Sequence, residues 1–560
     1  MNLLFVRKAL ALLALAAVAA CSNGGGTSSI PAGGGGGKPP PSSLLARIVG
    51  VGDSLTAGYQ AGGFLGATGF KDPLYPGIEV RPGQENGFWA YLYEQASGLA
   101  IPTAIGHMYD PSVSPLPLIA APGLNNQLVP SLPPPINFEK PGNACTDYGG
   151  FDAAGYTLHG NQRVRMNPAS TTVRNVAVPG MTLHEANTLT QPQSMSCKPL
   201  PGIQGLLAQV VDGESSTYWP VLGNWQFLGS RLTMVNAAAQ LKPTLATVWL
   251  GANDALKYMG SGGQFHGGDM TAGQAASDLH QTIKTLTAAG ARVVVANLPN
   301  ILHLPYFMRV TIPKNHAQAC AVQTYAACVM GAAIGFSFGG YKTGVALTTQ
   351  MAKAYHLGTP GGCTPASTTQ PCGYLTLQGT LTALQYWGTH GGKLPDLDNG
   401  HPGSGLGTYY ITPAFAAKVQ TLNNNLNDGI AMAAQATSTP LVDVATIFGG
   451  IASGNPSDPY FQQAVSIGSA SAPCCTLAYD AGLVSFDGLH PSNTGYALVA
   501  YYFIKTVNQA YAAHIPQVDV RAAYAGTRCS DPEQCFPDEY APPFNGALRP
   551  RVAGRDVPGR

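Results

Sequence analysis

Five continuous apolar runs constrain the fold of this 560-residue chain most strongly. Each run ends in Gly, Asn or Asp, as is typical of strands that are buried on both faces of a parallel sheet. The runs are Ala46–Val51, Val173–Val178, Leu245–Leu250, Arg292–Asn297 and Leu441–Ile447. The sequence therefore predicts a five-stranded parallel sheet.

Helical patterns lie between several of these runs. Met270–Ala289 carries apolar residues at helical spacing, and Tyr496–Tyr511 forms another such segment. Thr412 is a good N-cap, and Pro413 suits the first position of a helix that extends to about Ala436. Strands that alternate with helices predict an α/β fold, a three-layer αβα sandwich around the sheet.

Composition bears on the organisation of the chain. Hydrophobic residues make up 45% of it, enough for a large core, while 69 Gly and 45 Pro indicate many loops. We predict one domain over residues 44–515, with two loop-rich insertions at about 60–170 and 302–407 and a tail at 516–560. A net charge of +1 with 10% charged residues gives no electrostatic footprint for nucleic acid.

The N-terminus predicts export. Arg7 and Lys8 precede an apolar stretch that is too short to span a bilayer and that is typical of a signal peptide over residues 1–21. It ends in Val-Ala-Ala-Cys at Cys21, which resembles a bacterial lipobox, and a Gly/Ser/Pro linker follows over residues 22–43. We expect a lipid anchor at Cys21 that holds the protein to the bacterial cell envelope, at the outer membrane or in the periplasm. The alternative is an ordinary signal peptide cut at an Ala-x-Ala site.

The remaining ten cysteines agree with export, because an even number in an exported chain implies disulfides. None of them shows CxxC spacing, so zinc is not expected. The predicted pairs are Cys320/Cys328, Cys363/Cys372, Cys529/Cys535, Cys145/Cys197 and the adjacent Cys474/Cys475.

Polar residues and glycines follow the predicted strands, at the sheet edge where ligands bind in open parallel sheets. Ser54 follows the first strand, Gly180 the second, and Asn253 with Asp254 the third. At a helix N-terminus a serine meets backbone N–H groups that favour a developing anion. Taken singly, each block also fits a simpler structural role: a helix cap for Asp53-Ser54 and Asp254, and a turn for the others.

Asp487 and His490 stand three residues apart near the C-terminus. A serine nucleophile needs a base and a carboxylate that fixes the tautomer of that base, and these two side chains supply both from one loop. A lone Asp-Gly-x-His-Pro is more often a turn with a surface histidine.

All four blocks occur in order, and as an ordered set the sequence resembles the GDSL, or SGNH, hydrolase family. The matching blocks are Gly52–Ser54, Gly180, Gly251–Asp254 and Asp487–His490. The resemblance implies a flavodoxin-like SGNH fold and a Ser54–His490–Asp487 triad. It also implies an oxyanion hole formed by the N–H groups of Ser54 and Gly180 and the Asn253 amide. It implies ester hydrolysis with no metal or organic cofactor, on lipids, simple esters or acetylated sugars.

Three alternatives remain open. Gly335–Gly339 matches a GxSxG elbow around Ser337, but no convincing buried strand precedes it. An acyltransferase would use the same acyl-enzyme, and a surface binding lipoprotein could keep the fold without the chemistry. The sequence identifies neither the ester substrate nor the oligomeric state.

Overall fold

The computed structural model describes the central domain and parts of its insertions. The described residues are 43–59, 83–98, 115–117, 119–120, 164–165, 171–190, 221–222, 232–263, 265, 270–308, 350–357, 372–397, 409–467, 475, 477, 483–484, 488–521 and 523.

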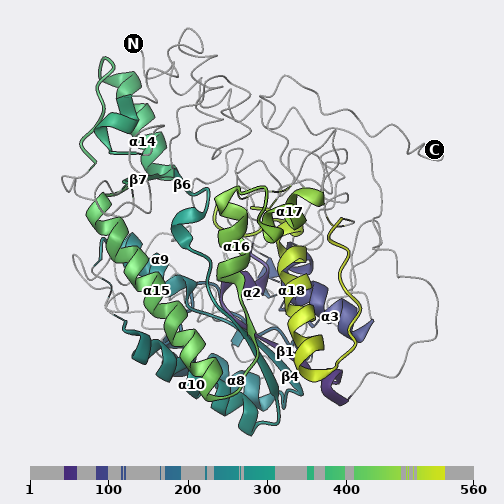
Figure 1. The fold of residues 1–560 in the computed structure, drawn as a ribbon. Helices are drawn as coiled ribbons and strands as arrows, with labels where there is room; N and C mark the ends of the chain where they lie inside the picture. The colour runs from purple at the N-terminus through teal and green to yellow at the C-terminus, as the bar shows by residue number, and fades with distance from the viewer. Residues whose placement is uncertain are drawn as a thin grey trace.

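A parallel sheet lies at the centre of the domain (Figure 1). Its strands, in spatial order, are β1 (Ile48–Gly52), β4 (Leu245–Trp249), β5 (Arg292–Ala296) and β9 (Leu441–Val442). All neighbouring pairs are parallel, so the carboxyl ends of the strands meet at one edge. The predicted α/β class with a parallel sheet is confirmed.

The sheet has four strands among the described residues, where five were predicted. The run Val173–Val178 lies beside the free edge of β1, but it forms an isolated parallel bridge between Asn175 and Gly50. The Val176 and Val178 N–H groups donate to the Gly50 and Gly52 carbonyls of β1. The Ala177 N–H, between them, bonds to the Asn175 side chain and not to another strand. On the other side, two of its backbone N–H groups bond to the carbonyl of Pro115.

The fifth predicted strand is also shorter than expected. The run Leu441–Ile447 supplies the two residues of β9 and then enters helix α16 (Val444–Ser453). Asp443 ends the strand, because its side chain caps that helix through the Thr446 N–H.

Helices cover both faces of the sheet (Figure 1). Helices α8 (Met234–Gln240) and α10 (Ala272–Ala288) lie on one face, and α15 (Pro413–Ala436) packs against α10. The other face is covered by α3 (Phe88–Ser97) and α18 (Asn493–Tyr511), which pack on each other. The remaining α-helices among the described residues are α2 (Ser54–Ala57), α5 (Glu185–Thr188), α9 (Ala252–Gly260), α14 (Leu377–Thr389) and α17 (Pro459–Ser466).

The three predicted helices are confirmed. Helix α10 begins at a capping box in which Thr271 and Gln274 bond reciprocally. Helix α15 has Thr412 as its N-cap and Pro413 at its start, as the sequence indicates. Helix α18 begins three residues before the predicted segment, because Ser492 caps it.

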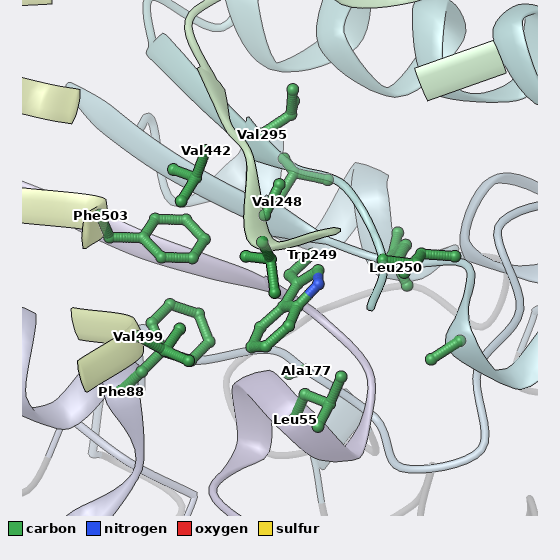
Figure 2. Close-up of a cluster of buried hydrophobic side chains, with 14 of the residues drawn as sticks. Leu55, Phe88, Ala177, Val248, Trp249, Leu250, Val295, Val442, Val499 and Phe503 are labelled. Atoms are coloured by element: carbon green, nitrogen blue, oxygen red, sulfur yellow. The ribbon is translucent and has the colours of Figure 1, made fainter. Parts of the chain in front are cut away.

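An aromatic cluster joins α3 and α18 to the sheet (Figure 2). Phe88 stacks on Phe503 with ring centroids 4.5 Å apart, and it meets Trp249 edge-on at 5.4 Å. Phe88 and α3 lie in the interval 60–170, which the sequence analysis treats as a loop-rich insertion. Part of that interval is therefore core helix, since its large side chains fill this face of the sheet.

The second insertion has a small core of its own. Strands β6 (Phe307–Met308), β7 (Tyr374–Thr376) and β8 (Tyr410–Ile411) form an antiparallel sheet. A separate buried cluster that includes Met351, Tyr355 and Leu375 packs against this sheet. This part of the chain is therefore more ordered than the loop that its composition predicts.

The start of the predicted tail belongs to the core, because Val518 and Val520 are buried there. Cys372 and Cys475 are both disulfide-bonded. The predicted pairings include cysteines outside the described residues, so they stay predictions. Within the described part of the chain, no helix is both long and apolar enough to cross a membrane.

Candidate active site

Ser54 lies at the carboxyl end of β1, as predicted. Asp53 caps the short helix α2 by accepting a hydrogen bond from the Leu55 N–H at 2.9 Å. Ser54 is thus the first residue of a helix, and the residue is 8% exposed. The first N–H groups of a helix have no acceptor within that helix, so this position favours negative charge.

The structure brings His490 to Ser54 across 436 residues of sequence. His490 Nε2 lies 2.9 Å from Ser54 Oγ, and the imidazole packs on the ring of Tyr59 with centroids 4.8 Å apart. The loop before His490 is held by a bond from the Tyr306 N–H to the Gly488 carbonyl. A buried hydroxyl bonded to an imidazole is the arrangement that an activated serine requires.

Gly180 lies at the centre of a tight turn. The Met181 N–H bonds to the Val178 carbonyl at 3.1 Å, with Pro179 and Gly180 between them. Gly180 has a φ of +87°, which favours glycine, and proline followed by glycine is typical of a type II turn. The Gly180 N–H makes no hydrogen bond with any residue that the structure describes.

Asn253 joins the ends of β1 and β4 to this turn. Its Nδ2 atom donates to Asp53 Oδ2 at 3.1 Å and to the Met181 carbonyl at 3.2 Å. Ser54, Gly180 and Asn253 therefore sit on three segments that are bonded together at one edge of the sheet. Both hydrogens of the Asn253 side-chain amide therefore have acceptors in the structure, which contains no substrate.

Two buried carboxyl groups lie beside these residues. Burial raises the pKa of Asp53 to about 7, although the Leu55 N–H, His490 and Asn253 each favour its charged form. Burial also raises the pKa of Asp254 to about 8, against the Leu183 N–H, and the negative charges of Glu185 and Asp53 add to the increase. Near neutral pH, Asp254 therefore holds its proton for most of the time.

Asp254 does not cap α9, contrary to the sequence prediction. Gly251 occupies the N-cap position of that helix, with no side-chain cap. Asp254 Oδ2 instead accepts a hydrogen bond from the Leu183 N–H at 2.9 Å, 71 residues earlier in the chain. An acidic residue after a Gly-x-Asn turn fits a helix cap by sequence, but here the helix begins at Ala252 and Asp254 lies within its first turn.

The raised pKa of Asp254 predicts how the stability of the protein changes with pH. A folded-state pKa of about 8 against an ordinary 3.8 means that the folded protein keeps a proton which the unfolded chain releases. The free energy of unfolding should therefore fall as pH rises from about 4 to about 8. Asp254→Asn removes this titratable group, so the free energy of unfolding of the variant should fall less steeply with pH than that of the wild type. Urea unfolding at several pH values measures the difference, and parallel curves for the two proteins would contradict the assignment.

Three of the candidate functional residues, Asp487, Cys21 and Ser337, lie outside the described residues. No cluster of three or more His, Cys, Asp or Glu side chains in the described ranges could hold a metal ion.

A comparison with known protein families covers two of these blocks. Residues 135–331 match the family described as GDSL-like Lipase/Acylhydrolase. This match supports the resemblance to the GDSL family that the sequence motifs indicate. The matched segment contains Gly180 and Asn253, whereas Ser54 and His490 lie outside it. Comparisons with curated proteins and with solved structures gave no significant match. The GDSL match supports an α/β fold and ester hydrolysis in general.

Sequence reasoning missed the polar residues that hold the site together. Asp53 appears in the GDSL block next to Ser54, but nothing in the sequence indicates that its carboxylate accepts from Asn253. The ion pair between Lys257 and Glu185 joins segments 72 residues apart. Partners so far apart in the chain produce no local sequence pattern that would indicate their contact.

Proposed function

We propose that the chain hydrolyses carboxylic esters through a covalent acyl intermediate on Ser54. The observation that carries the proposal is the 2.9 Å contact between Ser54 Oγ and His490 Nε2 at the carboxyl end of β1. Both residues are buried, at 8% and 7% exposure, so the interaction of their side chains is only weakly screened by water. The GDSL match supports the same class of reaction.

In this mechanism His490 accepts the Ser54 hydroxyl proton as Oγ attacks the ester carbonyl. Asp487, three residues before His490, is proposed to orient the imidazole. The oxyanion is proposed to bind the N–H groups of Ser54 and Gly180 and the Asn253 amide. The Gly180 N–H suits this role, since it makes no bond to the described residues. To bind the oxyanion as well, the Asn253 amide would have to share one of the two hydrogens that it now donates to Asp53 and to the Met181 carbonyl.

Collapse of the tetrahedral intermediate expels the alcohol, which takes its proton from His490. Water then enters and gives a proton to His490 as its oxygen attacks the acyl carbon. Collapse of this second tetrahedral intermediate breaks the bond to Ser54 Oγ, which takes the proton back from His490, and the acid is released. An acceptor alcohol in place of water would make the same site an acyltransferase. The proposed substrates are lipid, simple or sugar acyl esters.

A serine-reactive phosphonate tests whether the site is catalytic. We expect the probe to modify the wild-type protein at Ser54 and to block hydrolysis of a panel of esters that differ in acyl length and alcohol size. A surface binding lipoprotein on the same fold would neither hydrolyse any member of the panel nor react with the phosphonate.

We also propose that the protein is exported and anchored by lipid at Cys21, on the support of the lipobox and the linker that follows it. Cys21→Ser should move the protein from the membrane fraction to the soluble fraction, because the acyl chains supply the membrane affinity. Mass spectrometry that finds an unmodified mature N-terminus at another residue would contradict the anchor.

A further inference from the structure

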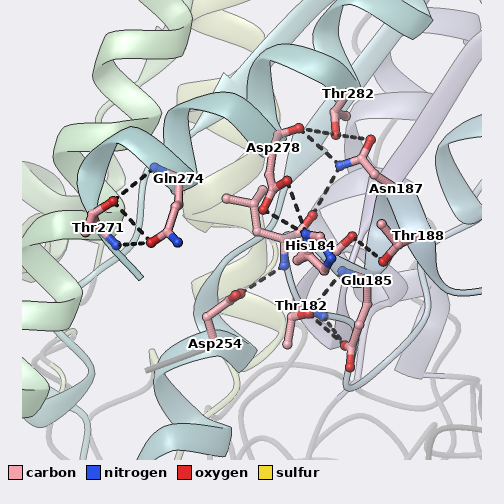
Figure 3. Close-up of polar contacts among 11 residues, drawn as sticks. Thr182, His184, Glu185, Asn187, Thr188, Asp254, Thr271, Gln274, Asp278 and Thr282 are labelled. Atoms are coloured by element: carbon pink, nitrogen blue, oxygen red, sulfur yellow. Dashed lines mark hydrogen bonds and ion pairs between the residues drawn. The ribbon is translucent and has the colours of Figure 1, made fainter. Parts of the chain in front are cut away.

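The segment after Gly180 is tied to helix α9 by a buried carboxyl. We call residues 179–184 the Gly180 loop. Within it, the Leu183 N–H donates to Asp254 Oδ2 at 2.9 Å, and Figure 3 shows Asp254 pointing from α9 toward this backbone. Asp254 is 1% exposed and directly follows Asn253 in the first turn of the helix.

The bond to the loop is the main interaction that Asp254 makes. Its Oδ1 atom is buried and has no hydrogen-bond partner among the described residues. A buried carboxyl with one unsatisfied oxygen lowers stability compared with an apolar residue. A contribution to stability alone therefore does not account for an acid at this position.

A second contact holds the same loop to the same helix. Lys257 lies one turn after Asp254 on α9, and its Nζ atom pairs with Glu185 at 2.9 Å. Glu185 Oε2 in turn accepts hydrogen bonds from the Thr182 N–H at 2.9 Å and the Thr182 hydroxyl at 2.8 Å. The N–H groups of two consecutive loop residues are thus fixed by groups that α9 carries or positions.

A residue of the candidate active site also binds the Gly180 loop to α9, because the Met181 carbonyl accepts a hydrogen bond from the Asn253 amide. Bonds at residues 181 and 183 therefore connect the loop to Asn253 and to the residue that follows it. A shift of the loop would move the Gly180 N–H relative to the Asn253 amide.

We propose that Asp254 is a positioning residue, which holds the Gly180 loop so that the Gly180 N–H and the Asn253 amide converge on one substrate oxygen. This inference rests on the proposed ester hydrolysis and goes beyond it, since it assigns a role to the acid of the Gly251–Asp254 block. Displacement of a catalytic donor by about 1 Å can lower a rate about 100-fold.

The test compares Asp254→Ala with Asp254→Asn. Alanine removes the acceptor, so kcat for an activated ester should fall about 10- to 100-fold with KM changed less than about 2-fold. Asparagine keeps an oxygen for the Leu183 N–H and resembles the protonated acid, so its kcat should lie within about 3-fold of the wild type. Asp278→Asn is the matched control, because Asp278 contacts the loop through the exposed His184. Its kcat should not change.

Amide hydrogen exchange gives a readout that does not depend on activity. Peptides that cover residues 180–189 should exchange faster in Asp254→Ala than in the wild type or in Asp254→Asn. Asp254→Ser, whose hydroxyl is too short to reach Leu183, replaces the alanine variant if that variant does not fold.

Unchanged kcat and exchange in Asp254→Ala would overturn the inference, as would an asparagine variant no better than alanine. If the wild-type protein hydrolyses no ester, the proposed function fails. The exchange data would still show whether Asp254 fixes the loop.

Discussion

Ser54→Ala is expected to lower kcat for an activated ester by about 10³-fold or more. The change removes the Oγ atom that lies 2.9 Å from His490 Nε2 and that is the proposed nucleophile. Folding should be retained, because the loss is one small buried side-chain group worth about 1 kcal/mol. Steady-state kinetics and a thermal melt on the same preparation measure both quantities.

Ser337→Ala is the matched control for this prediction. Ser337 lies in the GxSxG sequence and would be the nucleophile if that sequence were an α/β-hydrolase elbow. We expect its substitution to change kcat less than about 2-fold. Activity that survives in Ser54→Ala and disappears in Ser337→Ala would show that the nucleophile has been assigned to the wrong strand end.

Asn253→Ala is expected to lower kcat by about 10²–10³, or about 3–4 kcal/mol, with KM nearly unchanged. An oxyanion donor acts mainly in the transition state, so its loss affects the chemical step more than substrate binding. The structure adds a second consequence. Because Asn253 donates to Asp53 and to the Met181 carbonyl, its removal also leaves two buried acceptors without that donor. We therefore expect a loss of about 1–3 kcal/mol in stability as well.

Asn425→Ala separates these two effects. Asn425 lies on α15, and its amide donates to the Met270 carbonyl at 3.2 Å, away from Ser54. This control should lose stability and keep its kcat. If Asn253→Ala behaves in the same way, with kcat within a few-fold of the wild type, Asn253 holds the segments together and does not bind the oxyanion.

The candidate site could be located from the sequence because its residues follow apolar runs. Ser54 and His490 are far apart in the chain, yet each lies in a short block with a fixed place relative to a strand or to the C-terminal helix. In a parallel sheet, those places converge at one edge. The bond between the two side chains agrees with that expectation.

The remaining features depend on contacts that no local pattern encodes. Helix α3 lies in an interval rich in Pro, Gly and Tyr, and its position becomes clear only from the packing of Phe88 against Phe503. The run Leu441–Ile447 is apolar enough for a strand, but the cap at Asp443 turns most of it into helix. Asp254 fits a helix cap by position, whereas its partner is the backbone of Leu183.

In the proposed mechanism Ser54 carries an acyl group during turnover, and this intermediate can be trapped. The wild-type protein is mixed with an activated ester, quenched in acid within the first turnovers, digested and analysed by mass spectrometry. We expect an acyl adduct on the peptide that contains Ser54 and none in His490→Ala, which lacks the base. An adduct on the peptide that contains Ser337 would contradict the mechanism, as would continued hydrolysis by Ser54→Ala at the wild-type rate.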